Sequence, residues 1–138
     1  MELTATRIIT DDLPRIVDFY ERITGIQSVR LHELFAELRT ESGTLAFASS
    51  ATIPLLGEGS AEARANRSVI LDIRVDDVDA IYPTLHDVVD EFVNEPTTMP
   101  WGNRSLLFRD PDGNLVNFFT PTPAAHVGDD DAIDSTIS

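Results

Sequence analysis

The stretch Arg109–Phe119, which reads RDPDGNLVNFF, decides how this chain folds. Its PDGN segment at 111–114 has the residue types of a tight turn. The segments on either side, 103–110 (NRSLLFRD) and 115–119 (LVNFF), are rich in apolar and aromatic residues. The stretch therefore predicts a β-hairpin. Asn117 lies four residues past Gly113 of this turn, and the type of residue at that position bears on what the protein does.

The first half of the chain predicts a strand, a helix and a second hairpin. Residues 3–9 (LTATRII) form the strand, and Asp12 and Gly25 are the residue types that begin and end a helix. Two further strands follow, LFAELRT at 34–40 and TLAFASS at 44–50. Between the two caps, four apolar residues share one helical face: Ile16, Phe19, Tyr20 and Ile23.

The second half repeats this order of elements. Residues 68–75 (SVILDIRV) alternate as a strand with one buried face, and the DDV at 76–78 begins a helix. Pro83 predicts a kink or a restart of that helix. The hairpin of 103–119 completes the repeat, and residues 53–67 form the linker between the halves. Each half would leave one sheet face uncovered, and we expect two such faces to form a shared cleft.

Composition limits the classes of function. The chain has 138 residues, 42% of them hydrophobic and 25% charged, which is typical of a globular domain. It contains no cysteine, which excludes disulfides, thiolate nucleophiles and Cys-based metal sites. We find no signal-peptide pattern and no apolar run near the ~20 residues that cross a bilayer. These features favour a cytoplasmic protein.

The net charge of -14 limits the partners. A surface this acidic repels nucleic acid and anionic membranes. It favours a cationic ligand or only serves solubility, and the sequence leaves both interpretations open. All ten basic residues are arginine, so Schiff-base chemistry on lysine is excluded. Residues 122–138 form an acidic tail whose composition predicts mobility.

Three motifs together resemble a known family. They are DDL…FY…G in the first half, VDDVDAIY in the second, and PWGNRSLLFRDPDGNLVNFF at 100–119. This pattern is similar to the vicinal oxygen chelate superfamily, which includes glyoxalase I, bleomycin resistance proteins, fosfomycin resistance enzymes and extradiol dioxygenases. The resemblance implies an α+β fold in which two βαβββ modules form a curved mixed sheet around a cleft. It implies one domain at 1–121, with modules at 1–52 and 68–121, and a homodimer.

The resemblance also places the positions at which metalloenzymes of the family hold their ion. One lies on the first strand of each module, seven residues before the Asp that precedes the helix. Another follows each hairpin turn, and Gly43 and Gly113 align the two turns. In this sequence the four positions are Ala5, Phe47, Ile70 and Asn117. Three of them lack donor atoms, and an Asn carbonyl is a weak ligand, so we predict no family-type metal site and no cofactor.

Strand alternation predicts which side chains face the cleft. The residues expected to contact a ligand are Arg7, Phe35, Glu37, Phe47, Ile70, Asp72, Arg74, Asn117 and Phe119, with Trp101 in a loop at the cleft mouth. The residues expected on the opposite, helix-facing sides are Ile8, Ala36, Leu38, Leu71, Ile73, Val75, Leu106, Phe108, Val116 and Phe118. The side chain of Trp101 would stack on a ligand or anchor the loop. Arg7 and Asp72 would form a structural ion pair or contact the ligand.

These features favour a metal-free small-molecule-binding protein that resembles the drug-sequestering bleomycin resistance proteins. The expected ligand is a small organic molecule with cationic or aromatic character. The alternative is an enzyme of the same superfamily, a lyase, isomerase or dioxygenase. Its catalytic candidates are Asp72 and Glu37, which would need desolvation to act as a base. A third interpretation is an interaction module with an empty cleft.

Overall fold

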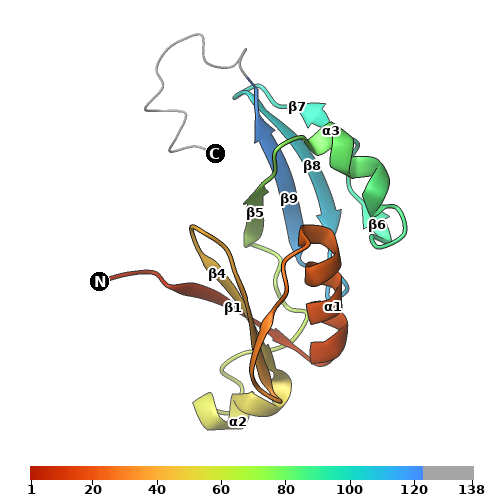
Figure 1. The fold of residues 1–138 in the computed structure, drawn as a ribbon. Helices are drawn as coiled ribbons and strands as arrows, with labels where there is room; N and C mark the ends of the chain where they lie inside the picture. The colour runs from red at the N-terminus through yellow and green to blue at the C-terminus, as the bar shows by residue number, and fades with distance from the viewer. Residues whose placement is uncertain (123–138) are drawn as a thin grey trace. The chain divides into compact units, whose positions relative to one another are not determined.

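The computed structural model describes residues 1–122 of the chain (Figure 1). These residues form two compact units. The first contains residues 1–66 together with the turn residues 111–113, and the second contains residues 67–110 and 114–122. All of the predicted acidic tail except Thr122 lies outside the described residues.

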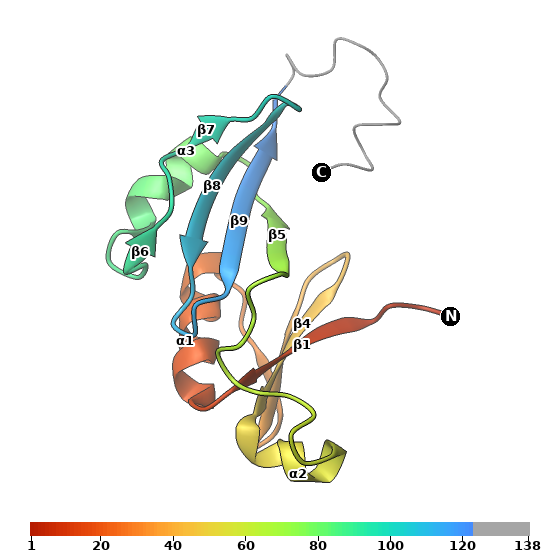
Figure 2. The same cartoon turned by 180° about the vertical axis from the view of Figure 1, so that it is seen from behind.

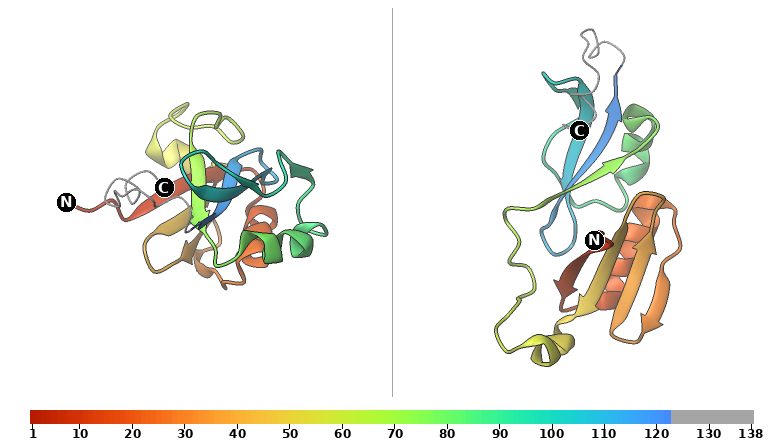
Figure 3. Two further views of the ribbon diagram at one scale, coloured as in Figure 1. Left: turned by 90° about the horizontal axis from the view of Figure 1, so that it is seen from above. Right: turned by 90° about the vertical axis from the view of Figure 1, so that its left-hand side faces the viewer.

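The first unit is a four-stranded sheet with one long helix. The strand order is β1-β4-β3-β2. Strand β1 runs parallel to β4, and the other pairs are antiparallel. The elements are β1 (Ala5–Thr10), α1 (Leu13–Thr24), β2 (Val29–His32), β3 (Phe35–Arg39) and β4 (Thr44–Ser49). Helix α1 lies across one face of this sheet (Figure 3).

Helix α1 has the predicted ends and the predicted buried face. The Asp12 side chain accepts a hydrogen bond from the Arg15 amide at 3.1 Å, which satisfies a free N–H of the first turn. Gly25 ends the helix in the left-handed conformation, with φ 73°. The buried side chains of the helix are Leu13, Ile16, Val17, Phe19, Tyr20 and Ile23.

The second unit is a five-stranded sheet with a short helical segment. The order is β5-β9-β8-β6, and β7 also pairs with β8 (Figure 2). Strand β5 runs parallel to β9, and the other pairs are antiparallel. The strands are β5 (Ile70–Arg74), β6 (Glu91–Phe92), β7 (Thr97–Thr98), β8 (Asn103–Arg109) and β9 (Leu115–Pro121).

Pro83 interrupts the second helix, as predicted. Helix α3 (Val78–Ile81) is followed by the 3-10 turn η2 (Tyr82–Leu85), because proline removes a backbone donor and clashes with a preceding carbonyl. Asp79 of α3 forms a bidentate ion pair with Arg104 of β8, at 2.6 and 2.9 Å. Hydrogen bonding to Arg104 lowers the pKa of Asp79. The ion pair holds this helical segment against its sheet.

The predicted turn at 111–114 closes the β8–β9 hairpin. The buried Asp110 carboxylate accepts hydrogen bonds from the Asn114 amide N–H at 2.9 Å and from Asn114 Nδ2 at 2.8 Å. The Asp110 N–H in turn donates to the Asn114 carbonyl at 3.0 Å. Gly113 has φ 87°, a conformation that favours glycine. These contacts set the register that pairs Arg109 with Leu115.

Several elements were not predicted. Strands β2, β6 and β7 lie where the sequence suggested none, and the linker begins with η1 (Ser50–Thr52) and α2 (Ile53–Leu56). Strands β6 and β7 have two residues each, too few to show an alternating pattern. Among residues 1–122, no helix has the length and apolar character needed to cross a membrane.

The predicted face of Phe47 is wrong. Phe47 is fully buried and its ring contacts Tyr20 of α1, with ring centroids 5.2 Å apart. It pairs across the sheet with Ile8 and Ala36, which were predicted on the helix-facing side. Residues that pair directly across strands share a face, so Phe47 and Leu45 face α1. The other predicted helix-facing residues are buried or half-buried: Ile8, Ala36, Leu38, Leu71, Ile73, Val75, Leu106, Phe108, Val116 and Phe118.

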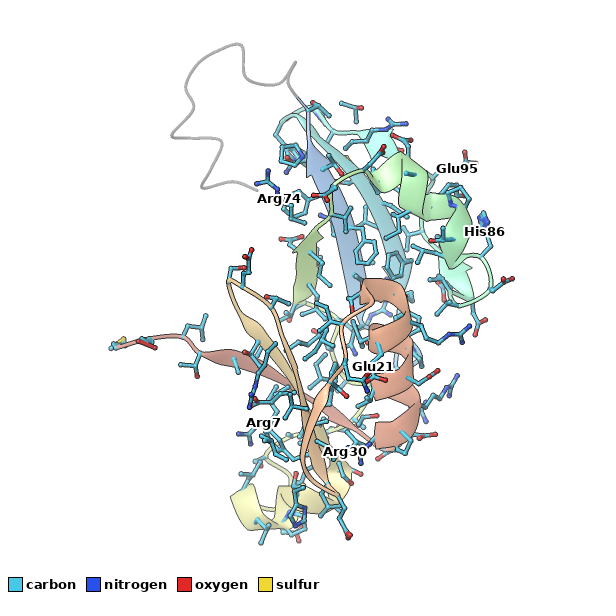
Figure 4. All side chains as sticks on the ribbon, viewed as in Figure 1. Arg7, Glu21, Arg30, Arg74, His86 and Glu95 are labelled. Carbon is cyan, nitrogen blue, oxygen red and sulfur yellow. The ribbon has the colours of Figure 1, made fainter. Side chains whose placement is uncertain are left out.

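Glu21 links the end of α1 to the chain that leads into β2. Its Oε2 accepts hydrogen bonds from the Ser28 amide at 2.8 Å and from Ser28 Oγ at 2.6 Å. These hydrogen bonds, with a smaller contribution from the charge of Arg30, lower the pKa of Glu21 from its ordinary value of 4.5. Figure 4 shows Glu21 on α1 and Arg30 on β2.

We expect Phe47→Ala to lower the free energy of unfolding by about 3–5 kcal/mol, because it leaves a cavity against Tyr20. Phe35→Ala, on the half-buried side of β3, should cost less than half as much. Urea unfolding of the two variants provides the measurement. An equal or larger loss for Phe35→Ala would contradict the assignment of Phe47 to the helix-facing side.

We expect Glu21→Gln to destabilise the fold at pH 7 and to have a smaller effect at pH 3. The pKa of Glu21 is lower in the folded chain than in the unfolded one. Its ionised form therefore stabilises the fold above about pH 4.5, and this contribution is lost as the pH falls through the folded pKa. The measurement is the difference in unfolding free energy between Glu21→Gln and the wild type at each pH. A difference that does not shrink at pH 3 would count against the ionised hydrogen bond.

Candidate functional site

Each sheet has one face covered by a helix and one face opposite it, which we call the open face. In the first unit, contact with Tyr20 places Phe47 on the helix-facing side, so its neighbours Ala46 and Ala48 lie on the open face. In the second unit, Arg104 pairs with Asp79 of α3, so Ser105 and its alternate neighbours lie on the open face. Figure 4 shows Arg7 and Arg74 projecting away from α1 and α3 respectively.

The first open face carries a cation stacked on an aromatic ring. The guanidinium carbon of Arg7 lies 5.1 Å from the centroid of the Phe35 ring, within the range of a cation–π contact. Ala46 and Ala48 of β4 lie between the strands that carry Arg7 and Phe35, and their small side chains leave room for this contact. Within residues 1–122, Arg7 forms no salt bridge. Its N–H groups therefore have no carboxylate partner there.

The neighbouring carboxylate on this face is already paired. Glu37 Oε1 accepts a hydrogen bond from Arg39 Nε at 2.9 Å, and the Glu37 side chain is 21% exposed. Residue Glu37 pairs across the sheet with Ala46, which in turn pairs with Arg7. The first open face therefore offers one unpaired cation, one ion pair and a floor of small side chains.

The second open face carries a hydrogen-bonded carboxylate and amide. Asp72 of β5 and Asn117 of β9 pair directly across the parallel strands, and Asn117 Nδ2 donates to Asp72 Oδ1 at 3.0 Å. Leu107 of β8 pairs with Asn117 on its other side. The Oδ1 atom of Asn117 is buried and has no hydrogen-bond partner within residues 1–122. This face therefore presents an unsatisfied acceptor beside an exposed carboxylate.

The remaining predicted ligand contacts lie at different depths. Ile70 at the start of β5 is 49% exposed, whereas Phe119 of β9 is only 7% exposed. Arg74 is exposed and pairs with Phe119 across the parallel strands. Trp101 is 56% exposed in the loop between β7 and β8. The structure thus brings Asp72 to Asn117 and Arg7 to Phe35, and Phe47 joins neither group.

The position equivalent to Asn117 in the first unit is Ala46, and the prediction of Phe47 was off by one residue. Arg7 pairs with Ala46 as Asp72 pairs with Asn117. The sequence did not identify Ala46 and Ala48 as open-face residues, and the cross-strand pairing of β3 with β4 is the signal that places them there. Alanine, like phenylalanine, has no donor atom in its side chain.

The donor atoms of the open faces do not fit a divalent metal ion. Among residues 1–122 there is no group of three or more His, Cys, Asp or Glu side chains that could hold an ion. At the family's metal-ligand positions, Ala5, Ile70 and Ala46 have no donor atom in their side chains. The donors that remain are the neutral side-chain carbonyl of Asn117 and, beside it, the carboxylate of Asp72. A stable site of the zinc or iron type needs three or four imidazole or carboxylate ligands. The open faces therefore lack the ligand set of a zinc or iron site.

The two catalytic candidates lack the surroundings of a desolvated base. Asp72 is an exposed residue, and its carboxylate accepts a hydrogen bond from Asn117. Glu37 is half-buried, and its carboxylate is paired with the Arg39 side chain. A general base of the kind predicted requires burial without a stabilising cation. Neither carboxylate meets that requirement in its own unit.

Comparison with known proteins establishes the family. The model of the Glyoxalase/Bleomycin resistance protein/Dioxygenase superfamily matches residues 3–118, so the chain belongs to this superfamily. This confirms the resemblance carried by the DDL, DDV and RDPDGN motifs. The protein YraH of Bacillus subtilis (strain 168) is 29% identical over 125 residues, which cover 86% of this chain and 98% of YraH.

Solved structures confirm the α+β fold. A glyoxalase/bleomycin resistance protein/dioxygenase from Nocardioides matches with a TM-score of 0.75 and 23% identity, over 95% of this chain and 90% of that one. A family enzyme of the same description from Burkholderia phytofirmans PsJN matches with a TM-score of 0.78 and 19% identity, over 88% and 99%. At these identities the likeness concerns the fold.

We expect the purified protein to hold less than about 0.1 mole of Zn, Ni, Mn or Fe per chain after dialysis, because the open faces lack a ligand set for these ions. Elemental analysis by plasma mass spectrometry provides the measurement. Adding Zn²⁺ or Ni²⁺ back should leave the melting temperature unchanged, since only an ion bound to the folded state stabilises it. One tightly bound equivalent of any of these metals per chain would contradict the conclusion that the open faces lack a metal-ligand set.

Proposed function

We propose that this protein is a metal-free binder of small organic molecules that resembles the drug-sequestering members of its superfamily. The observation that carries the proposal is the chemistry at the family's metal-ligand positions. These positions hold Ala5, Ala46, Ile70 and Asn117 in place of imidazole and carboxylate ligands. Side chains of this kind hold a ligand by packing and hydrogen bonds.

The open faces supply the contacts that such a binder needs. The Arg7 guanidinium rests on the Phe35 ring, which limits its motion while leaving its N–H groups available to a ligand acceptor. Ile70 is 49% exposed and offers apolar surface beside the Asp72–Asn117 pair. Apolar surface with a few fixed polar groups is the usual composition of a small-molecule site.

The partners follow from the charge and the family. A net charge of -14 disfavours nucleic acid and anionic membranes and is compatible with a cationic or aromatic organic ligand. The proposal includes a homodimer, as the family resemblance implies, and a cytoplasmic location, which the lack of cysteine supports.

An enzyme remains the second candidate, because the Asn117 amide holds the Asp72 carboxylate in a fixed orientation. A lyase or isomerase would use such a carboxylate to move a proton. The two proposals differ in the fate of the bound compound. Incubating each bound compound with protein for a day and recording its proton NMR spectrum separates them, since a binder returns the compound unchanged and an enzyme converts it.

We expect a thermal-shift screen of small aromatic and cationic compounds to find saturable ligands. A compound at about 100 times its Kd should raise the melting temperature by roughly 5–10 °C for a domain of this size. Phe35→Ala removes the ring under Arg7 and should weaken the binding of ligands that contact this face. Glu58→Gln, an exposed change in the segment after α2 and outside both sheets, is the control. A complete absence of saturable shifts would contradict the binder proposal and favour an interaction module with an empty cleft.

A further inference from the structure

The orientation of the Asn117 amide is fixed by its neighbour. A carboxylate only accepts hydrogen bonds, so the group that faces Asp72 Oδ1 at 3.0 Å must be the Nδ2 donor of Asn117. The amide oxygen Oδ1 must then point away from Asp72. The position of this acceptor is therefore determined by chemistry and does not depend on an arbitrary choice between the two amide atoms.

The Asn117 Oδ1 atom is buried, and no hydrogen-bond donor among the described residues is paired with it. Residue Asn117 has Leu107 beside it on β8, and Leu115 and Phe119 precede and follow it on the same face of β9. None of these three side chains carries a hydrogen-bond donor. A buried acceptor left unpaired costs about 1–3 kcal/mol, so native structures satisfy nearly all such groups. A donor from outside this set of side chains is required.

The carboxylate beside it also has no cation. Among the described residues, the one hydrogen bond of the Asp72 side chain is the bond from Asn117, and Asp72 forms no salt bridge. Arg74, two residues further along β5, forms no salt bridge with it. The second open face therefore combines the Asp72 carboxylate, which has no cation partner among the described residues, with the buried, unpaired acceptor Asn117 Oδ1. The two residues pair directly across β5 and β9.

We propose that Asp72 and Asn117 form a subsite for a positively charged N–H donor, a protonated amine or amidinium of a ligand that also carries an apolar group. One N–H donates to Asn117 Oδ1, and the positive charge lies against the Asp72 carboxylate. The apolar part packs on the half-buried Leu107 and on Ile70, which is 49% exposed. This inference rests on the proposed function and adds to it the chemical class of the ligand group.

Other occupants fit the same atoms less well. A carboxylate would be repelled by Asp72 and has no donor for Asn117 Oδ1, and a phosphate would be repelled by Asp72 as well. A neutral alcohol or a water molecule can donate to Oδ1 but gains nothing from the charge of Asp72. The apolar surroundings strengthen a charge-assisted hydrogen bond, which favours the cationic donor over the neutral one.

The test uses three compounds with one phenyl group: benzylammonium, benzyl alcohol and benzoate. Titrations of the full chain are followed by ¹⁵N NMR, with the Asn117 side-chain NH₂ signal as the local reporter. We expect benzylammonium to bind at least about fivefold more tightly than benzyl alcohol and to move the Asn117 signal. Benzoate should leave that signal unmoved.

Two variants and a control separate the subsite from the general charge of the protein. Asp72→Asn removes the carboxylate at an exposed position, and Asn117→Leu removes the acceptor. Each should weaken benzylammonium binding by about fivefold to tenfold, and Asp72→Asn, which keeps the Asn117 acceptor, should leave benzyl alcohol binding within about twofold. Asp87→Asn removes an equal charge from an exposed loop of the same unit and should have no effect.

The outcomes distinguish this inference from the proposed function. If benzyl alcohol or benzoate binds as tightly as benzylammonium, the cationic subsite is wrong, while the binder proposal stands. The cationic subsite is also wrong if Asp87→Asn weakens benzylammonium binding as much as Asp72→Asn does. The ligand is then attracted by the net charge of the protein and not by Asp72 in particular. If the Asn117 signal responds to none of the compounds, only water occupies the acceptor and the inference fails. If no compound from the thermal-shift screen binds, the proposed function fails instead.

Discussion

The hydrogen bonds between Asp110 and Asn114 are the contacts on which the second open face depends. Both residues are buried, and the Asp110 carboxylate accepts from the backbone and the side chain of Asn114 at 2.9 and 2.8 Å. This turn leaves one register for the β8–β9 hairpin, and that register places Asn117 opposite Leu107. A slip of one residue would turn Asn117 toward the helix-facing side and Val116 toward the open face. The chemistry of the site is thus set by a turn that contributes no atom to it.

The sequence correctly predicted which residues of β5 and β9 share the second open face, but it assigned the wrong side chains of β4 to the first. The cause is a difference in length between the two hairpin loops. Asp72 and Asn117 share a face as the alternation predicted. In the first hairpin Arg39 pairs with Thr44, so its loop has four residues, 40–43. In the second, Arg109 pairs with Leu115, so its loop has five, 110–114. Aligning the two loops by their glycines therefore shifts β4 by one residue, which exchanges Phe47 for Ala46.

Other features of the site depend on pairings that no local pattern encodes. The strand β2 has only four residues, all of them exposed, so its short VRLH alternation was not enough to identify it, and its backbone partners come from β3. The Arg7–Phe35 contact requires the small residues Ala46 and Ala48 between their strands, and this requirement becomes visible only when β1, β4 and β3 are placed side by side. Helix α1, in contrast, was predicted with both of its ends and four of its six buried residues, because its caps and its apolar face are local features.

The two units carry opposite charges at one equivalent position. Arg7 pairs with Ala46 in the first sheet as Asp72 pairs with Asn117 in the second. Each of these charged residues interacts with a neutral neighbour on its own open face, a phenyl ring for Arg7 and an amide for Asp72. Neither neighbour neutralises the charge, but each restricts the side chain, so less conformational entropy remains to be lost when a ligand binds. The repeated fold therefore fixes where the charged groups lie, while the residues at each position are free to differ, which is how one scaffold hosts different chemistries.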